Sequence, residues 1–316
     1  METNENEIRL TVKKLFDEDK IDILIGYSPG TLPLRTSPVF LRKEDDVEVL
    51  VWNSFCENTL SNYLKNYKDK RVGIVAKGCD SRLINLLLLE SQVKKENLVV
   101  IGVPCRGVID RKKIDKITGG MEVTGSEEKE DGILIFFDGT DKKVTKADIL
   151  HDSCMICNYK NAVSSDIFIG EKEKEEKVDP YNKIREMEEN STDERWNYFN
   201  KEIEKCIRCY ACRNVCPMCY CQECFVDCTD PEWFGKTAEI KDTKMFHIVR
   251  AYHMAGRCVD CGACVKACPM DVDLRFLTKK IEKDVLEFFA YEAGVKDDEP
   301  PPFTTFKPED PQEFIR

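Results

Sequence analysis

The 316-residue sequence lacks several features that define common classes of protein. No apolar run approaches the roughly 18 residues that a membrane-spanning helix needs, so we expect no membrane span. The opening residues, METNENEIRL, have neither the basic nor the apolar part of a secretory signal, and we expect a cytoplasmic protein. Basic residues are in the minority, with 48 Lys and Arg against 59 Asp and Glu. This balance disfavours nucleic acid as a partner, because such binding depends on neutralising phosphates.

Patterns of familiar catalytic and nucleotide sites are also missing. No GxGxxG motif follows a strand-like segment, so a standard dinucleotide-binding fold is not supported. The three histidines, His151, His247 and His253, are not grouped at the spacing of metal ligands. No constellation of a Ser or Cys hydrolase is present. The hydrophobic content of 42% is nevertheless enough for a packed core, which excludes a fully disordered chain.

Cysteine is what the sequence has in excess. Of the 17 cysteines, five lie before residue 206 and the rest lie in residues 206–268. Without an export signal we expect a reducing compartment, in which disulfides are rare. Cysteine at this local density therefore indicates metal binding.

Two copies of one spacing, C-x2-C-x2-C-x3-C-P, dominate this region, at residues 206–217 and 258–269. Three cysteines two residues apart curl a loop around one corner of a 4Fe–4S cubane, and the fourth ligates the other cluster. Cluster one is therefore predicted to use Cys206, Cys209, Cys212 and Cys268. Cluster two is predicted to use Cys258, Cys261, Cys264 and Cys216. Zinc sites are built from C-x2-C pairs and do not need this repeated pattern.

The tandem pattern resembles the bacterial two-cluster ferredoxin domain over roughly residues 200–275. It differs from the simplest form in a long gap between the motifs, which carries Cys219, Cys221, Cys224 and Cys228. One interpretation is that these four cysteines hold a further cluster, complete or shared. The other is that they fill the space around the first cluster as small apolar thiols.

Residues 1–170 alternate strand-like and helix-like segments. Buried strands are predicted from short apolar runs at 21–26, 71–76, 98–103 and 132–137. Helices are predicted from apolar spacing at 57–67 and 81–89. Strands and helices in this order favour an α/β domain with a mostly parallel sheet.

The remaining chain divides by composition. Residues 171–199 are expected to form a charged linker, and residues 200–294 a mainly helical dicluster ferredoxin-like domain that ends in a helix over 274–294. Residues 295–316 form a proline-rich tail with Phe303, Phe306 and Phe314. Aromatic residues are favoured as interface anchors, so the tail is interpreted as a partner contact or as a strap packed on its own module.

Two further cysteines directly follow predicted strands. Cys79 comes after the second strand and Cys105 after the third, so both would lie at the carboxyl edge of a parallel sheet. That edge is where open α/β sheets bind ligands. With Cys154 and Cys157 they would supply four thiolates for a third 4Fe–4S cluster. The alternative is that Cys79 and Cys105 are buried structural thiols, which would be the preferred interpretation for a single cysteine. Cys56 is an alternative ligand.

The segments KGCDSRLINLLLLE, VVIGVPCRGVID and CMICNYKNAVSSDIFIGE resemble the beta subunits of deazaflavin-reducing hydrogenases and formate dehydrogenases. The resemblance covers roughly residues 20–170 and implies an iron–sulfur flavoprotein, with one 4Fe–4S cluster beside an FAD. In the archaeal members of the family this FAD reduces coenzyme F420. Carried over by motif, Cys105, Cys154 and Cys157 are cluster residues, with Cys79 as the fourth.

Four residues are candidates for holding a flavin. Tyr27 and Gly30 follow the first predicted strand, where glycine permits close backbone approach and tyrosine can stack on a ring. Lys77 and Arg82 flank Cys79 and would offset the negative charge of a cluster or a flavin phosphate. The alternatives are an ordinary strand-to-loop turn for the first pair and solvent-facing residues around a helix start for the second.

These features together predict an iron–sulfur electron-transfer subunit of an anaerobic oxidoreductase complex of hydrogenase, formate dehydrogenase or heterodisulfide-reductase-like type. It would relay electrons between a catalytic partner subunit and a flavin or cluster, without a residue that acts as acid or base. One alternative is a free-standing FAD-dependent reductase of coenzyme F420 or another soluble acceptor. Another is a structural iron–sulfur protein.

Overall fold

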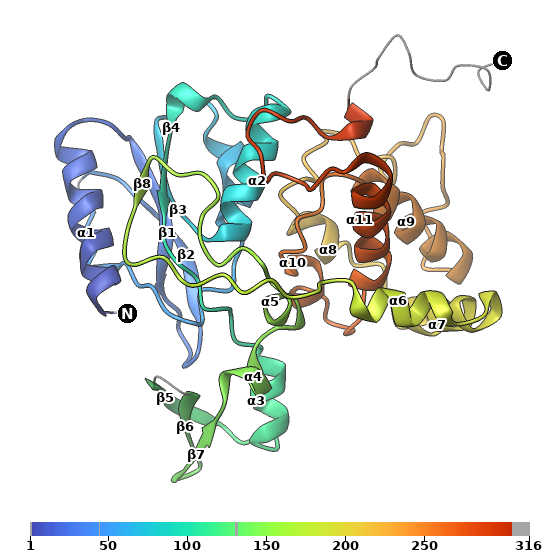
Figure 1. Cartoon of the computed structure of the whole chain (residues 1–316), viewed down its shortest axis with the longest axis horizontal. Coiled ribbons are helices and arrows are strands. Elements are labelled where there is room, and N and C mark those ends of the chain that lie inside the picture. Colours follow the sequence, from blue (N-terminus) through green and yellow to red (C-terminus); the bar gives the residue numbers. More distant parts are fainter. Residues whose placement is uncertain (1, 44, 130–131, 305–316) are drawn as a thin grey trace.

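The computed structural model describes residues 2–43, 45–129 and 132–304. It has an N-terminal α/β part and a helical C-terminal region that lies beside it (Figure 1). The sheet of the N-terminal part has the strand order β2-β1-β3-β4-β8. Its strands are β1 (Ile23–Pro29), β2 (Thr36–Leu41), β3 (Val72–Ala76), β4 (Leu98–Gly102) and β8 (Ile167–Phe168).

The sheet is mixed rather than wholly parallel. Strands β1, β3, β4 and β8 run parallel, whereas β2 pairs antiparallel with β1. Every residue of β3 is buried, which explains its unbroken apolar sequence. Helix α1 (Glu2–Asp17) lies on one side of the sheet and helix α2 (Gly78–Leu89) on the other, towards the C-terminal region (Figure 1). The predicted α/β domain is thus confirmed, with a mixed sheet.

The apolar run at 132–137 does not join this sheet, so its prediction as a strand of the main sheet is wrong. It forms β6 (Gly132–Phe137), between β5 (Val123–Lys129) and β7 (Thr140–Val144), in a separate antiparallel sheet. With α3 (Arg111–Ile117) and α4 (Lys146–Ile149) this sheet forms a small lobe that has its own apolar core (Figure 1). An apolar run predicts burial, but it does not identify the sheet to which a strand belongs.

Short helical turns connect the strands. Three 3-10 helices span Val47–Val49, Leu60–Tyr67 and Lys95–Asn97. The second of them replaces the helix predicted over 57–67. The one-turn helix α5 (Asp152–Met155) follows the small lobe.

The C-terminal region is helical, as predicted. Its helices are α6 (Asn182–Glu189), α7 (Thr192–Glu204), α8 (Ala211–Asn214), α9 (Ile240–His253), α10 (Ala263–Lys266) and α11 (Arg275–Phe289), and a last 3-10 turn spans Pro302–Thr304. The helix predicted to reach Gly294 ends earlier, because Ala290 has a φ of 50° in the left-handed region, where an α-helix cannot continue. Part of the proline-rich tail, with Phe306 and Phe314, lies outside the described residues.

The N-terminal α/β part and the helical C-terminal region meet along helix α2. The guanidinium Nε of Arg82 donates to the carbonyl of Ala293 at 2.9 Å, and Asn85 Nδ2 donates to the carbonyl of Gly294 at 3.0 Å. At the end of α2, Glu90 accepts two bonds of 2.7 Å from Arg257. These contacts fix Arg257, in the cysteine-rich segment, and the segment after α11 against the helix whose first turn carries Cys79.

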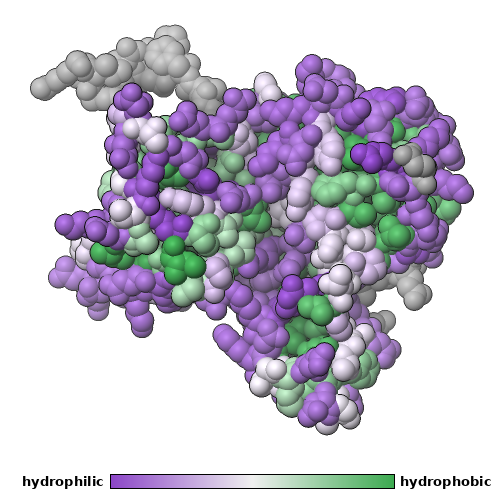
Figure 2. Space-filling view, turned by 180° about the vertical axis from the view of Figure 1, so that it is seen from behind, coloured by the Kyte–Doolittle hydropathy of each residue, from purple (hydrophilic) through white to green (hydrophobic). Residues whose placement is uncertain are grey.

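The surface is mostly polar, and apolar residues gather in separate patches, including one over the C-terminal helices (left in Figure 2). Among the described residues, no helix is long and apolar enough to cross a membrane.

Candidate iron–sulfur centres

The two cysteine motifs have the same backbone conformation. Arg208 and Tyr210 in the first motif have φ of 55° and 61°, and the matching residues of the second motif, Asp260 and Gly262, have φ of 53° and 70°. Each loop then enters a one-turn helix, α8 or α10. Left-handed backbone is unfavourable for a residue with a Cβ atom, so its repetition at matched positions indicates one shared loop geometry. The sequence repeat is therefore also a structural repeat.

The fourth cysteine of the first motif lies with the first three cysteines of the second. Cys216, Cys258, Cys261 and Cys264 line one small cavity. We call them the cluster-two set. Burial raises the pKa of Cys264 to about 11, and charge on Cys261 or Cys216 adds to that rise. The structure thus brings together the four thiols that the predicted ligand exchange requires.

The reciprocal group also forms. Burial raises the pKa of Cys206, and charge on Cys268 or Cys209 adds to that rise. Burial raises the pKa of Cys212 to about 12, with Cys206 and Cys268 among its charged neighbours. We call these four residues the cluster-one set. Ligation of iron by either set stays a prediction, which the proximity of the thiols supports.

The buried guanidinium of Arg250 indicates that the cysteine-rich region accommodates a negatively charged group. Arg250 is 5% exposed, and its Nε atom has no hydrogen-bond partner in the described structure. The groups that hold its pKa above the ordinary value, against the effect of burial, are the thiols of Cys212, Cys216, Cys219 and Cys264. Neutral thiols would leave a buried cation uncompensated, which is strongly unfavourable. An anionic iron–sulfur cluster with thiolate ligands would compensate it, so the residues fit such a group.

Helix α9 places a second polar side chain against these cysteines. The Nε2 atom of His247 lies 3.2 Å from Cys206 Sγ. Burial, with Arg250 and Arg208 nearby, lowers the pKa of His247 to about 4, so the ring is neutral at pH 7. Sequence reasoning expected only that this helix packs beside the clusters and missed both His247 and Arg250. The available signal was two polar residues three positions apart, which share one face of a helix.

The strand-end cysteines also converge. Cys79 lies in the first turn of α2, directly after β3, and Cys105 follows β4, the parallel neighbour of β3. Burial raises the pKa of Cys105 to about 12, and charge on Cys154 or Cys157 adds to that rise. Charge on Cys105 likewise raises the pKa of the buried Cys79. The structure therefore brings these four thiols, the strand-end set, to the carboxyl edge of the sheet.

Close backbone packing holds the strand-end set in place. A Cβ atom on Gly78 would lie 2.0 Å from the carbonyl oxygen of Tyr159, so the loop after Cys157 touches the start of α2. The amide of Cys105 donates to the carbonyl of Lys160 at 2.8 Å. The three loops that carry the set are thus fixed to one another by main-chain contacts.

The strand-end set and the cluster-two set are neighbours. Charge on Cys261 contributes to the raised pKa of Cys79, after burial and the nearby Asp80. A Cβ atom on Gly262 would lie 2.4 Å from Ser153 Oγ, beside Cys154. The cysteine sets therefore form a row across the boundary between the sheet and the helical region.

The cysteines between the motifs are less clearly grouped. A cavity of about 510 Å³ is lined by Cys219, Cys221 and Cys224, together with Arg213, Arg250 and Arg257. Cys228 instead directs its thiol to the carbonyl of Cys224, at 3.6 Å. In the described part of the chain, no three His, Cys, Asp or Glu side chains are close enough to share a single metal ion. Cubane ligands need not meet that condition, because each thiolate binds a different iron.

All four flavin candidates have structural contacts of their own, and for Lys77 these include hydrogen bonds from Nζ to the carbonyls of Cys56 and Asn58. Tyr27 is 1% exposed, and its hydroxyl donates to the carbonyl of Asn58, so its ring lies in the core. Gly30 forms a tight turn in which its amide donates to the carbonyl of Arg35 at 2.9 Å. Arg82 binds the segment after α11, as described above.

Lys77, the fourth candidate, lines a polar cavity of about 840 Å³ at the sheet edge, together with Trp52, Cys105 and Arg106. Lys172 and Lys174 also line this cavity. Its volume is typical of small-molecule sites. Cys56 lines it too, and the buried thiol of Cys56 has a pKa raised to about 11. This cavity was not anticipated from the sequence, because its walls come from segments far apart in the chain.

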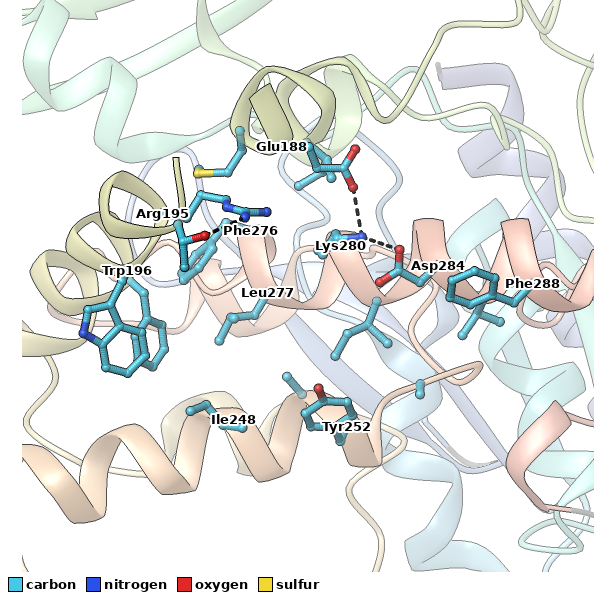
Figure 3. Close-up of a pocket in the computed structure, with 18 of the residues that line it drawn as sticks. Glu188, Arg195, Trp196, Ile248, Tyr252, Phe276, Leu277, Lys280, Asp284 and Phe288 are labelled. Atoms are coloured by element: carbon cyan, nitrogen blue, oxygen red, sulfur yellow. Dashed lines mark hydrogen bonds and ion pairs between the residues drawn. The ribbon is translucent and has the colours of Figure 1, made fainter. Parts of the chain in front are cut away.

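A second cavity of about 840 Å³ is an apolar groove between α9 and α11, closed at one side by α6 and α7 (Figure 3). Trp196 and Phe288 are exposed along it, and Lys280 pairs with Glu188 at its rim at 2.9 Å. Its wall residue Phe199 also packs in the core around the cluster-one set. No cysteine is among the described residues that line this groove.

Comparison with known proteins indicates the class to which this arrangement is similar. Residues 69–197 match the family model for the C terminus of the coenzyme F420 hydrogenase/dehydrogenase beta subunit, and residues 251–272 match a 4Fe-4S binding domain. The first match covers Cys79, Cys105, Cys154 and Cys157, and the second covers all four cysteines of the second motif.

Individual relatives agree with these matches. The chain is 28% identical over 356 residues to F420-dependent formate dehydrogenase 1 subunit beta of Methanococcus maripaludis, with 92% of this chain and 90% of the relative covered. It is 23% identical over 354 residues to F420-dependent formate dehydrogenase subunit beta of Methanocaldococcus jannaschii, with 92% of each covered. These similarities fit an iron–sulfur electron-transfer subunit of an oxidoreductase complex.

Among solved structures, a chain of the F420-reducing NiFe hydrogenase complex from Methanosarcina barkeri is similar, with 18% identity and a TM-score of 0.39. The likeness covers 48% of this chain and 58% of that chain.

Proposed function

We propose that this chain is the electron-transfer subunit of a formate dehydrogenase or hydrogenase complex, in which it relays electrons between a catalytic subunit and an FAD that reduces coenzyme F420. The observation that carries the proposal is the adjacency of Cys79 and Cys261. It joins the part of the chain that matches the hydrogenase and dehydrogenase family to the part that matches an iron–sulfur domain. The names of the two formate dehydrogenase relatives support the acceptor and the kind of complex.

The proposed route runs from cluster one to cluster two, then to the strand-end cluster and to the cavity at the sheet edge. Cys264 is a charged neighbour of Cys212, which supports the first step between centres. The closeness of Cys79 to Cys261 supports the second step, from cluster two to the strand-end cluster. Cys105 lines the cavity and supports the third step, from the strand-end cluster to the cavity. Bound clusters supply one-electron carriers. The chain's own residues hold the thiols in this order, with Cys209 of the cluster-one set exposed at the start of the route.

The cavity at the sheet edge has the chemistry that an FAD requires. Lys172 and Lys174 are exposed cations at the cavity, suited to the charge of a pyrophosphate, whereas Arg106 there is paired with Glu173 at 2.6 Å. Trp52 supplies an aromatic wall, and the buried Lys77 forms an ion pair of 3.3 Å with Asp80 beside the strand-end set. A bound flavin supplies exchange between two-electron and one-electron carriers. We therefore assign the FAD to this cavity rather than to Tyr27, Gly30 or Arg82.

The relay is tested by removing its middle carrier. In the anaerobically assembled complex, Cys79→Ser should lower the iron content by about four atoms, the content of one cubane, while cluster one and cluster two keep their signals. Reduction of coenzyme F420 driven by the substrate of the catalytic partner should fall by at least tenfold. Cys228→Ser, at a cysteine that belongs to none of the three sets and does not line the cavity at the sheet edge, is the matched control and should retain both. Full turnover by an iron-depleted Cys79→Ser complex would contradict the relay.

The same complex separates the alternatives. A chain that reduces coenzyme F420 with an artificial donor, but never co-purifies with a catalytic subunit, would support the free-standing reductase. Clusters that are present but never change oxidation state during turnover would support the structural role.

A further inference from the structure

We infer that helix α9 sets the reduction potentials of the two clusters in the cysteine-rich region. Arg250 raises the potentials of both clusters, and His247 raises the potential of cluster one alone. The inference rests on the proposed clusters and goes beyond them, because it assigns a role to residues that ligate no iron.

Arg250 lies between the two proposed clusters. It lines the small cavity of the cluster-two set beside Cys216 and Cys264, and Cys212 of the cluster-one set is among its charged neighbours. Its Nη2 atom donates to the carbonyl of Cys212 at 3.0 Å, which fixes the guanidinium beside the first loop. Among the described residues it forms no ion pair with a carboxylate, and its buried Nε atom has no hydrogen-bond partner. The positive charge of Arg250 is therefore directed at cysteines of both sets.

His247 lies one turn earlier on the same helix and is 3% exposed. Its Nε2 atom is 3.2 Å from Cys206 Sγ, within the distance of an N–H···S hydrogen bond. A thiolate sulfur can only accept, so Nε2 carries the hydrogen when Cys206 ligates iron. Cys206 belongs to the cluster-one set, so this hydrogen bond acts on one cluster.

Reduction adds one negative charge to a cluster. A buried cation and an N–H group directed at ligand sulfur both stabilise the reduced form, and they therefore raise the potential. The effect is large at buried positions, because the surrounding medium screens charge weakly there. Arg208, the other buried cation near Cys206, is 3.9 Å from Asp242, which offsets its charge. Arg250 has no carboxylate partner among the described residues; the thiol of Cys219, whose pKa a hydrogen bond with Cys216 and the charge of Arg250 lower to about 7, is its neighbour outside the two sets.

The test is a redox titration of the full chain, purified anaerobically and followed by electron paramagnetic resonance. Arg250→Met and Arg250→Gln remove the charge and should lower the potentials of both clusters. Arg250→Lys keeps the charge and should restore most of the shift. Lys241→Met removes a cation from the exposed start of the same helix and should leave both potentials unchanged.

The histidine gives an independent arm. His247→Leu should lower the potential of cluster one and leave that of cluster two unchanged, and His247→Gln, which keeps an N–H donor, should reverse part of the shift. Wild-type potentials in a neutral Arg250 variant that retains its iron would overturn the role of Arg250. If neither neutral variant retains iron while Arg250→Lys does, Arg250 is a requirement for assembly and the inference is wrong. Absence of the two clusters from the wild-type chain would instead overturn the proposed function.

Discussion

The proposed exchange of the fourth cysteine between the two motifs depends on the positions of single residues. Cys216 lies with Cys258, Cys261 and Cys264, although some forty residues of chain separate it from them. Cys268 lies near Cys206 and Cys212 in the same way. The spacing alone predicted this arrangement, because the fourth cysteine of such a motif cannot reach back to its own cluster.

Reciprocal substitutions test the exchange at this scale. Cys216→Ser should disturb the resonance signal of cluster two and leave that of cluster one intact, and Cys268→Ser should do the opposite. The measurement is electron paramagnetic resonance of each reduced variant after anaerobic purification. A Cys216→Ser chain in which only cluster one is altered would show that each motif completes its own cluster.

A second prediction at the residue scale concerns Gly78. Its missing side chain leaves room for the carbonyl oxygens of Tyr159 and Asn161, which would lie 2.0 Å and 2.7 Å from a Cβ atom. Backbone cannot yield as a flexible side chain does, so Gly78→Ala should displace the loop after Cys157. We expect about four fewer iron atoms per chain, the content of one cubane, and a lower melting temperature. Gly125→Ala is the matched control, since its Cβ atom would meet only Phe136 at 3.5 Å, and unchanged iron in Gly78→Ala would contradict the strand-end site.

At the scale of elements, the sequence predicted what depends on local pattern. The apolar runs at β3 and β4 identified two parallel strands, and these placed Cys79 and Cys105 at one edge. The end of α11 was not predicted, because an alanine does not signal the left-handed backbone that Ala290 adopts. The separate sheet around β6 was not predicted, because it depends on contacts between separate segments. His247 and Arg250 were missed for the same reason. The spacing of residues along α9 does not predict that cysteines lie opposite His247 and Arg250.

The proline-rich tail, residues 295–316, has two competing interpretations. In its described part, the Phe303 ring packs edge-on against Phe289 of α11 with ring centroids 5.1 Å apart, and Pro302 lies beside Gly256. These contacts favour the strap over the partner contact for residues up to 304. Deletion of residues 297–316 should therefore lower the melting temperature and the iron content of the chain. Loss of co-purification with a catalytic subunit, at unchanged iron and melting temperature, would identify the tail as a partner contact instead.

At the scale of the whole molecule, the C-terminal region and the sheet are joined where electrons would need to cross. The ion pair of Arg257 with Glu90 holds the start of the second motif against α2, whose first turn carries Cys79. The bonds of Arg82 and Asn85 hold the segment after α11 against the same helix. The cysteine sets therefore follow one another from the helical region to the cavity at the sheet edge. An assembly of this kind suits transfer between a partner and a bound acceptor better than it suits an isolated structural role.

Anaerobic reductive titration of the full-length chain, followed by visible absorbance and calibrated by iron and acid-labile sulfide content, tests the central claim most directly. The proposal predicts about twelve iron atoms and twelve sulfides for three cubanes, and about one electron accepted per cluster as the absorbance bleaches, with two more electrons taken up when FAD is bound. Stoichiometric zinc without sulfide would contradict it. So would a full complement of clusters that accept no electrons.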